Sequence, residues 1–397
     1  MKYFIKYIWI FLIVVSAISS WFISCKNSKK EPFDSQIIKL IPTKLEQIKF
    51  SQIFSSVEIF IFGTNDEIIY VRPEKIIVKN NLFYLLASKM IIVWDEKGNL
   101  VLNISHIGNG PGDYIGIDDF QVEDNGNIIV NDNAGQKMIR YNSRGEYINT
   151  INHGLNARNF IKINEMLYIN SGDLGGYQSE YKVHAWNETN KKIEKRYLKR
   201  GPEAKYFGVL EYTNFSYFND TLSYSQSFSN TIYQLTDNNA IPRLFIDFGK
   251  HNLPKGYAED FTDMSSFMQS FGNSGYASRI DGYREGNNYL FLAYSYKEKR
   301  PFLWLSKIEN VIHHFNEFED DFLFPSVIQN TGYHCLPIFI DEDDVYFSID
   351  AYRFIELYDS IKKIDNQKLE YQILIKSIYD RINEDSNSLI IKYKIKK

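Results

Sequence analysis

Leu82-Phe83-Tyr84-Leu85-Leu86 comes directly after the polar pair Asn80-Asn81 and is followed by Met90-Ile91-Ile92-Val93-Trp94. The turn Asp95-Glu96-Lys97-Gly98-Asn99 then leads into a third run, Leu100-Val101-Leu102-Asn103-Ile104. Short runs rich in β-branched and aromatic residues, bounded by Asn and Gly turns, are typical of antiparallel strands. This stretch therefore predicts three consecutive strands of one antiparallel sheet.

The same order of turns and strands recurs along the chain. A second copy contains Asn125-Gly126-Asn127, Ile128-Ile129-Val130, Lys137-Met138-Ile139-Arg140-Tyr141 and Tyr147-Ile148-Asn149-Thr150-Ile151. Looser copies begin at Asn164, Asn219, Asn287 and Asp343. These six starts lie about 50 residues apart on average, which is the spacing of propeller repeats. The pattern predicts an all-β fold, a six-bladed β-propeller.

The turns have a recognisable chemistry. Asp95–Asn99 and Asn142–Glu146 place Gly98 and Gly145 where a type I turn with a bulge needs a positive φ. These turns and the acidic stretch 123–127 lack the 12-residue ligand set and the flanking helices of an EF-hand. We therefore interpret them as hairpin turns rather than as calcium loops.

Two segments depart from the strand pattern. Phe261 to Phe271 carries apolar residues at helical spacing and predicts a short amphipathic helix or a surface loop. Asn366 to Ile382 predicts a short C-terminal helix inserted before the last strand, Ser388–Ile395. Pairing of strands from opposite chain ends removes an exposed sheet edge, so we expect Ser56–Phe62 to share a blade with the C-terminal strands.

The composition excludes some functional classes. The 397 residues carry a net charge of −4, so there is no electrostatic reason to expect a nucleic acid as partner. The 29 Tyr and 29 Phe favour β structure. The two cysteines, Cys25 and Cys335, are too few for a disulfide framework or a multi-cysteine metal site.

The N-terminus has the pattern of an export signal. Lys2 and Lys6 precede an apolar run from about Tyr7 to Ile23, and Ser24-Cys25 then leads into a polar tract. This order resembles a bacterial lipoprotein signal, in which the cysteine thiol receives a diacylglyceryl group and the chain is cleaved before it. A transmembrane anchor and a plain signal peptide with an incidental cysteine are the alternatives.

These patterns divide the chain into three parts. We expect residues 1–24 to be a lipoprotein signal peptide, residues 25–40 to hold the lipidated cysteine and a tether, and residues 41–397 to form the six-bladed propeller. Several acyl chains on Cys25 would anchor the protein stably. A membrane, reached through this lipid anchor, is therefore the first expected partner.

Three phrases of the sequence carry a family resemblance: Ile107–Tyr114; Asn230–Leu235, with Pro242–Gly249 and Leu253-Pro254 after it; and Glu384–Leu389. Together they resemble the six-bladed β-propeller lipoproteins of Gram-negative envelopes, which are related to NHL and TolB-like propellers. Asp113 stands where that family usually has Glu, and Ser388 where it usually has Pro. The resemblance covers about residues 20–397 and implies an outer-membrane lipoprotein of the cell envelope, on its periplasmic or its surface side. It implies no activity.

The sharpest local feature is the loop formed by Gly108, Gly110, Pro111, Gly112, Asp113 and Tyr114. A glycine-rich loop can present backbone N–H groups to an anion, so these residues are a candidate ligand-facing loop. The Lys and Ser/Thr of a P-loop are absent, which argues against nucleotide binding. The alternative is a tight turn between blades with Tyr114 packed beneath it.

The sequence predicts no catalytic residues, no metal site and no cofactor. The seven histidines show no zinc-ligand spacing, and the adjacent His313 and His314 would point to opposite faces of a strand. The acidic clusters Glu319-Asp320-Asp321 and Asp341-Glu342-Asp343-Asp344 are interpreted as solvated turns. No Gly-x-Ser-x-Gly elbow is present.

These observations favour a membrane-anchored envelope propeller that binds a ligand or a protein. A carbohydrate is one candidate ligand, because Tyr and Trp side chains combine an apolar face with a polar group. An envelope hydrolase or lyase that acts on a glycan or peptide at the central funnel is the alternative. Three or more His, Asp or Glu side chains that converge at one funnel mouth would favour the enzyme.

Overall fold

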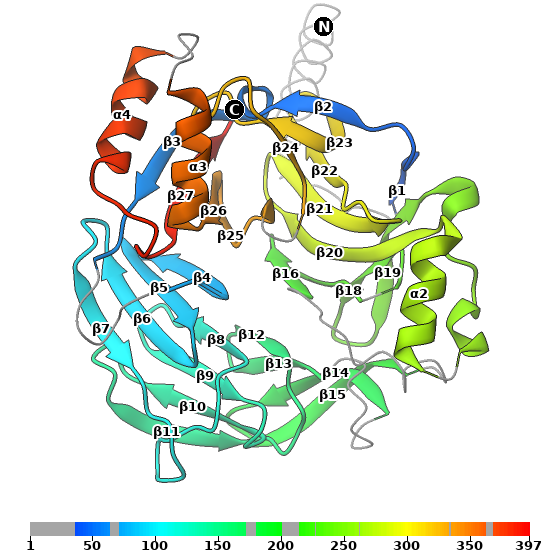
Figure 1. The fold of residues 1–397 in the computed structure, drawn as a ribbon. Coiled ribbons are helices and arrows are strands. Elements are labelled where there is room, and N and C mark those ends of the chain that lie inside the picture. Colours follow the sequence, from blue (N-terminus) through cyan, green and yellow to red (C-terminus); the bar gives the residue numbers. More distant parts are fainter. Residues whose placement is uncertain are drawn as a thin grey trace, which may run out of the picture. The chain divides into compact units, whose positions relative to one another are not determined.

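Antiparallel meanders of four strands repeat along the chain in the computed structural model of the protein (Figure 1). The structure describes residues 36–63, 71–171, 180–200, 214–226, 228–261, 263–332, 335–362 and 368–397. The predicted signal peptide, Cys25 and most of the predicted tether lie outside these ranges. Residues 37–397 form one compact unit.

Five blades in the described part of the chain each contain four strands that are consecutive in the sequence. Blade one has β4 (Lys75–Lys79), β5 (Leu82–Ala87), β6 (Met90–Asp95) and β7 (Leu100–Ile104). Blade two has β8 (Asp119–Val122), β9 (Ile128–Asp132), β10 (Lys137–Tyr141) and β11 (Tyr147–Asn152). Blade three has β12 (Asn159–Ile163), β13 (Met166–Asn170), β14 (Tyr181–Asn187) and β15 (Lys192–Lys199). Blade four has β16 (Phe215–Phe218), β17 (Thr221–Tyr224), β18 (Thr231–Leu235) and β19 (Ala240–Asp247), and blade five has β20 (Ala277–Glu285), β21 (Tyr289–Tyr296), β22 (Phe302–Ser306) and β23 (Val311–Glu319).

A further sheet joins the two ends of the described chain. It is here called the mixed sheet because it combines strands from both ends; its strand pairs are all antiparallel. It contains β25 (Phe339–Asp341), β26 (Asp344–Ile349), β27 (Leu389–Ile395) and β3 (Phe54–Phe60), in that order. Strand β27 pairs antiparallel with β3, which confirms the predicted pairing of the N-terminal and C-terminal strands. We predicted six blades, whereas five are found as meanders of consecutive strands; the predicted count is therefore not confirmed.

An N-terminal strap, residues 36–60, crosses the outer edges of two blades before it enters the mixed sheet. Its first strand, β1 (Gln36–Lys39), lies beside β19 of blade four, and β2 (Glu46–Lys49) runs parallel to β23 of blade five. The short 3-10 helix η1 (Phe50–Gln52) then leads into β3. A short strand, β24 (Ile328–Asn330), also pairs with β23. The predicted tether therefore ends in ordered strand structure at Gln36.

The turns within the blades have the geometry that their residues predict. Asn80 and Asn81, between β4 and β5, both have a positive φ, of 52° and 60°. Gly98, between β6 and β7, has a φ of 83°, and the Asp95 carboxylate accepts hydrogen bonds from the backbone N–H groups of Lys97 and Asn99. Glycine adopts a positive φ without steric cost, so these hairpins form locally.

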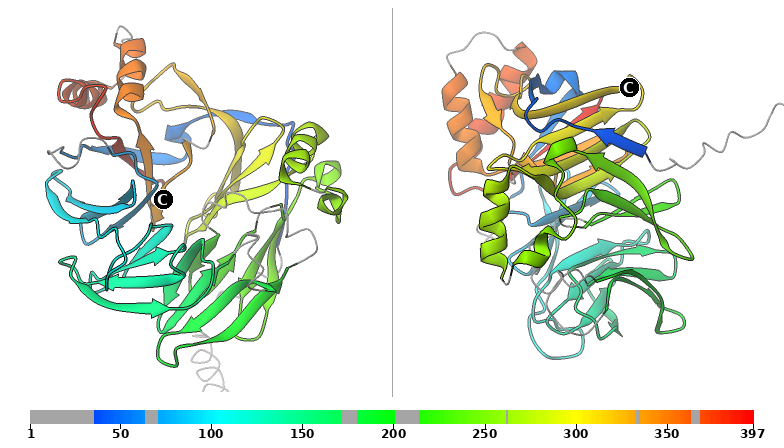
Figure 2. Two further views of the ribbon diagram at one scale, coloured as in Figure 1. Left: turned by 60° about the horizontal axis from the view of Figure 1, so that its bottom comes forward. Right: turned by 90° about the vertical axis from the view of Figure 1, so that its right-hand side faces the viewer.

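In the part of the chain that the structure describes, three α-helices lie outside the sheets (Figure 2). Helix α2 (Met264–Ser274) begins where Asp263 accepts a hydrogen bond from the Ser266 backbone and ends at Gly275, which has a left-handed conformation. Helices α3 (Ala351–Ile361) and α4 (Leu369–Tyr379) lie between β26 and β27. The 3-10 helices η3 (Gly249–His251) and η4 (Tyr257–Asp260) precede α2. The sequence predicted α4 to within a few residues, left a helix or a surface loop open where α2 lies, and did not predict α3.

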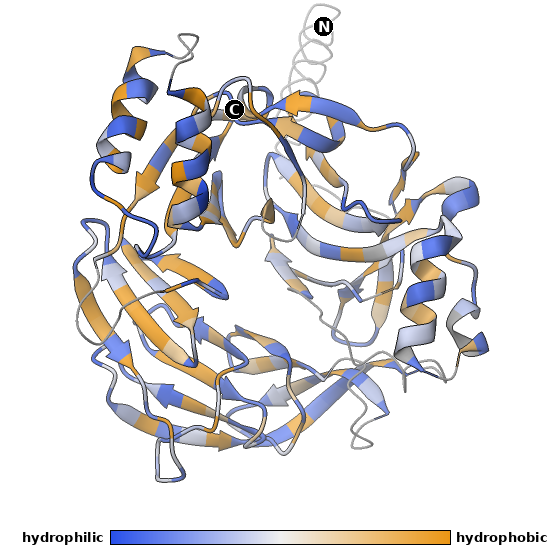
Figure 3. Ribbon diagram, in the orientation of Figure 1, coloured by the Kyte–Doolittle hydropathy of each residue, from blue (hydrophilic) through white to orange (hydrophobic). Residues whose placement is uncertain are grey.

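The core lies between neighbouring sheets, where hydrophobic strands face one another (Figure 3). Between blades one and two, for example, Val93 packs in one cluster with Phe120 and Tyr141. The first strands of the blades lie innermost, and β4 contacts both β8 and β25 (Figure 1). No helix in the described part of the chain is long and apolar enough to cross a membrane.

Candidate ligand pocket between two blades

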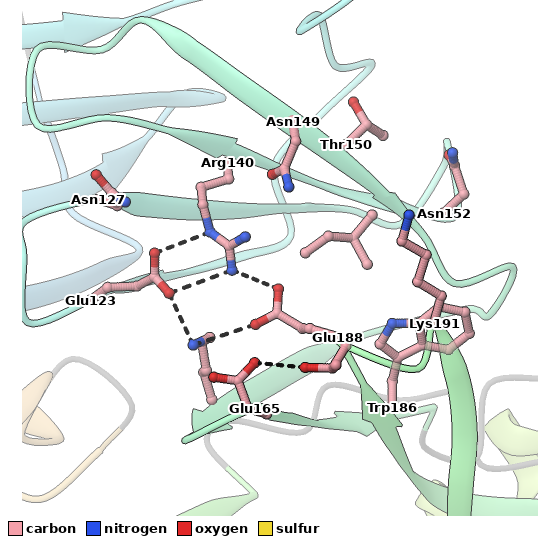
Figure 4. A pocket seen from close by; sticks show the side chains of 13 residues that line it. Glu123, Asn127, Arg140, Asn149, Thr150, Asn152, Glu165, Trp186, Glu188 and Lys191 are labelled. Atoms are coloured by element: carbon pink, nitrogen blue, oxygen red, sulfur yellow. Dashed lines mark hydrogen bonds and ion pairs between the residues drawn. The ribbon is translucent and has the colours of Figure 1, made fainter.

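A pocket of about 670 Å³ lies between blades two and three (Figure 4). Its lining comes from the turn after β8, from β10 and β11, and from β12 and the end of β14 with the turns that follow. The site therefore forms only when two sequential blades pack together. Most of the side chains that line it are polar or charged.

Four charged side chains form a closed ring on the pocket wall. Arg140 of blade two lies between two carboxylates, with its Nε 3.0 Å from Glu123 Oε2 and its Nη2 2.6 Å from Glu188 Oε1. Lys162 of blade three lies between the same two, with its Nζ 3.1 Å from Glu123 Oε1 and 3.3 Å from Glu188 Oε2. Positive and negative groups thus alternate around the ring and join the two blades (Figure 4).

The charges of this ring balance one another. Partial burial of Lys162 by itself lowers its pKa, but the neighbouring Glu123 and Glu188 carboxylates outweigh that effect and raise it overall. Lys162 therefore remains a cation at neutral pH. With two cations and two carboxylates in mutual contact, the wall is polar yet has no net charge.

Three asparagines of the lining have side chains without a hydrogen bond to any described residue. Asn149 and Asn152 are exposed on β11, and Asn127 is partly exposed in the turn after β8. A carboxamide offers two donors and an acceptor with two lone pairs. These groups can accordingly bind a ligand that both donates and accepts hydrogen bonds.

Trp186 and Lys191 complete the chemistry of the pocket. Trp186, in β14, is partly exposed, and its indole Nε1 has no hydrogen-bond partner in the described structure. Lys191 is exposed and has no carboxylate partner among the described residues. An indole provides an apolar face, so the pocket combines one aromatic surface with several free polar groups.

The predicted ligand-facing loop lies elsewhere, between blades one and two. Tyr114 is fully buried, and its hydroxyl donates to the carbonyls of Lys89 (2.9 Å) and Ile104 (3.1 Å). Burial raises the pKa of Tyr114 to about 12. In addition, the Tyr141 hydroxyl donates to the Gly112 carbonyl at 2.5 Å. The loop is thus bonded to both blades.

The loop also satisfies much of its own polarity. The Asp113 carboxylate accepts a hydrogen bond from the Gly110 N–H at 2.8 Å. A Cβ on Gly108 would come within 2.5 Å of the same carboxylate, which explains the glycine there. None of the six loop residues lines the pocket between blades two and three. A ligand-facing role for Gly108, Gly110, Pro111, Gly112, Asp113 and Tyr114 stays a prediction.

The histidines are distributed over different blades. His314 accepts or donates a hydrogen bond with the Tyr294 hydroxyl at 2.7 Å, and His184 does so with Ser171 at 3.2 Å. His334 lies outside the described residues. Within the described ranges, no three His, Cys, Asp or Glu side chains are grouped so that they could hold a metal ion.

One acidic cluster differs from its prediction as a solvated turn. Asp320 is only 3% exposed. Its carboxylate accepts hydrogen bonds from the backbone N–H groups of Phe322 and Leu323 and from the Tyr393 hydroxyl. The turn is buried because Asp320 bonds to Tyr393 of β27 in the mixed sheet. The two residues are far apart in the sequence, so a local pattern does not reveal this contact.

The repeated antiparallel meanders around an axis define a β-propeller protein. The chain belongs to the family described as a domain of unknown function (DUF4934), whose model matches residues 35–394. The predicted relation to NHL and TolB-like propellers is not confirmed by this match. No curated protein matches the chain.

The chain is similar to two solved structures of Bacteroides proteins, of which the first shares its fold. An exported protein from Bacteroides fragilis NCTC 9343 is 17% identical, with 91% of this chain and 100% of that chain covered and a TM-score of 0.72. A member of the DUF4221 family from Bacteroides vulgatus is 12% identical, with 86% and 97% covered and a TM-score of 0.48. At these identities the likeness concerns the fold alone.

Proposed function

We propose that the protein is a binding module of the cell envelope and that its ligand, a neutral carbohydrate, enters the pocket between blades two and three. The observation that carries the proposal is the pocket itself. It pairs the partly exposed face of Trp186 with the free carboxamides of Asn127, Asn149 and Asn152. Sugars present apolar C–H faces and hydroxyl groups that both donate and accept, so this lining is complementary to them.

The charges of the pocket support binding rather than catalysis. Glu123 and Glu188 are each in contact with both Arg140 and Lys162. Both carboxylates are thus engaged in ion pairs with two cations of the pocket wall, so their oxygens are not free to contact a ligand as a catalytic acid or base. The hydrolase or lyase alternative has no comparable support among the described residues.

Trp186 provides a direct test of the pocket. Trp94 and Trp304 are at most 3% exposed, whereas Trp186 is partly exposed, so a ligand in the pocket changes mainly the emission of Trp186. We expect a neutral gluco-, manno- or xylo-oligosaccharide to alter the fluorescence of the wild-type protein. The change should disappear in Trp186→Phe.

The carboxamides supply a second arm of that test. The double variant Asn149→Ala/Asn152→Ala should weaken oligosaccharide binding at least tenfold, because each lost hydrogen bond contributes roughly 1 kcal/mol. Asn238→Ala, an exposed asparagine in blade four, is the matched control and should bind as the wild type does. Binding of peptides but of no oligosaccharide would contradict the proposed ligand class.

We propose that the protein is located at the outer membrane and is anchored there by lipidation of Cys25. This proposal is supported by the N-terminal sequence pattern and by the exported Bacteroides protein that shares the fold. The variant Cys25→Ser should lose labelling by a radioactive fatty acid and should no longer sediment with membranes. A variant that is still labelled and membrane-bound would contradict the anchor.

We also propose that the mixed sheet serves as a sixth blade, as in NHL and TolB-like propellers. Its support is structural: the sheet has four strands, and its β25 contacts β4 of blade one. Strand β3 of this sheet is supplied by the opposite end of the chain. An experimental structure in which the mixed sheet stands away from blade one would refute this proposal.

A further inference from the structure

Arg284 places a positive charge at the centre of the ring. It lies on β20, the innermost strand of blade five (Figure 1). Its Nη1 donates to the Phe215 carbonyl of blade four at 3.0 Å and to the Tyr283 carbonyl at 2.8 Å. The side chain thus reaches from one blade to the next across the inner strands.

No carboxylate neutralises this guanidinium. Both of its hydrogen bonds use Nη1, and no described acid lies within ion-pair distance of Arg284. The Nε and Nη2 donors have no partner among the described residues, and the side chain is partly exposed. The bonds to Phe215 and Tyr283 use only one of the three guanidinium nitrogens. These two bonds are enough to link the blades, so a purely structural role leaves the other two nitrogens unexplained.

The acid across the axis is already paired. Asp119, on the inner strand of blade two, is the carboxylate whose field reaches Arg284. It accepts a hydrogen bond from Lys75 Nζ at 2.6 Å and another from the Phe160 N–H at 2.9 Å. Asp119 is thus paired with Lys75, and no described carboxylate is in contact with the Arg284 guanidinium.

Partial burial makes the positive charge of Arg284 costly. Loss of hydration is the main reason why the pKa of Arg284 is lowered from its ordinary value. A buried charge without a counterion is strongly destabilising unless something compensates it. An oxyanion is a suitable counterion, because its two oxygens match the paired N–H donors of a guanidinium.

We propose that the centre of the ring binds an oxyanion, a carboxylate or a phosphate group, on the free donors of Arg284. This site shares no residue with the pocket between blades two and three. The anion proposed here and the carbohydrate proposed for that pocket can therefore be two separate ligands.

The test is a titration of the purified protein with inorganic phosphate and, separately, with acetate, followed by calorimetry at constant ionic strength. We expect saturable binding of at least one anion with a stoichiometry near one. The two anions distinguish a phosphate site from a carboxylate site. Arg284→Gln should weaken binding at least tenfold, and Arg284→Lys should retain part of it.

Arg144→Gln is the matched control, because Arg144 is an exposed arginine paired with Glu146 in a turn of blade two. It should bind as the wild type does. Crystals of the wild-type protein soaked in selenate provide a readout that does not depend on folding of a variant, and an anomalous peak should lie beside Arg284. Absence of saturable binding, equal binding by Arg284→Gln, or no selenium peak at Arg284 would overturn the proposal.

Discussion

Gly98 occupies a turn in which both the backbone conformation and the close approach of a neighbouring carbonyl group require a residue without a side chain. Its φ is 83°, and a Cβ there would lie 2.2 Å from the carbonyl oxygen of Ile61, the residue that follows β3. Gly154 also has a positive φ, of 65°, but a Cβ at that position meets nothing within 4 Å. A side chain at Gly154 would therefore cause only backbone strain, whereas a side chain at Gly98 would cause the same strain and a steric clash as well.

We expect Gly154→Ala to lower the free energy of unfolding by about 1 kcal/mol, the usual cost of a left-handed alanine. Gly98→Ala should cost clearly more, because the backbone at Ile61 must move as well. Chemical denaturation of the two variants measures both values. Equal losses would show that the contact with Ile61 has no energetic consequence.

Asp320 links the stability of the protein to pH. Burial raises the pKa of this carboxyl from 3.8 to about 7, although hydrogen bonds from Tyr393 and from two backbone N–H groups oppose the shift. The folded protein then holds a proton on Asp320 at pH values where the unfolded chain has released it. Consequently the free energy of unfolding decreases as the pH rises from 3.8 to about 7.

We expect the contribution of Asp320 to fall by roughly 1.4 kcal/mol per pH unit at most in this window. Asp320→Asn, which has no proton to release, should remove that slope. Tyr393→Phe removes a hydrogen bond that stabilises the ionised form and should extend the slope to higher pH. Urea denaturation at pH 4, 5, 6 and 7 measures it, and the same slope in Asp320→Asn as in the wild type would refute the assignment.

Helix α4 has one buried side and one exposed side. Ile375 is fully buried in the cluster that also contains Phe354 of α3 and Leu389 of β27. Ile373, two residues earlier, is 60% exposed. The difference follows from the helical period, which places residues two apart on different faces.

We expect Ile375→Ala to lower the free energy of unfolding by about 2–5 kcal/mol, because it leaves a cavity in a packed core. Ile373→Ala should change it by less than about 0.5 kcal/mol. Thermal denaturation of both variants checks the prediction. A large loss in Ile373→Ala would mean that the exposed face of α4 is covered in the folded protein.

In the first two blades the sequence predicted three strands each but not the innermost one, β4 or β8, and in the later repeats it placed only one strand each. The predicted strands are rich in apolar residues, as in Met90–Asp95 and Lys137–Tyr141. Inner strands such as β8 and β12 are short and begin with a polar residue, Asp119 or Asn159. These two first residues bond to groups outside their own blades, Asp119 to Lys75 and Asn159 to Asn214, and a local sequence pattern does not reveal such partners.

The pocket was missed for a related reason. Glu123 and Lys162 lie almost 40 residues apart in different blades and meet only after the blades pack. Nothing in the local sequence around either residue indicates the other. By contrast, the Gly108–Tyr114 loop makes its contacts with residues close to it in the sequence. The sequence therefore offered a tight turn between blades as one of the two interpretations of this loop.

At the scale of the whole molecule, β27 closes the mixed sheet. It pairs with β26 on one side and with β3 on the other. Its residues Leu389, Ile391 and Tyr393 belong to the largest buried cluster among the described residues. Without β27, both neighbouring strands would have an unpaired edge.

We expect a chain that ends after Ser388 to lose the cooperative unfolding transition and to aggregate. Removal of Lys396 and Lys397 alone is the control, and it should leave most of the stability because β27 remains complete. Circular dichroism during heating, combined with light scattering, distinguishes the two outcomes. A cooperative transition in the longer truncation would show that the ring is stable without its terminal strand.

The N-terminal strap has a consequence for the order in which the protein folds. Ser51 bonds to Asp321, 270 residues later, and Ser55 bonds to the Lys394 carbonyl, 339 residues later. The ribosome therefore completes the strap long before it has made the residues that the strap pairs with. Contacts of such high sequence separation form slowly. Strand β3 consequently stays unpaired until β27 has been synthesised, and only then can its edge be protected from aggregation.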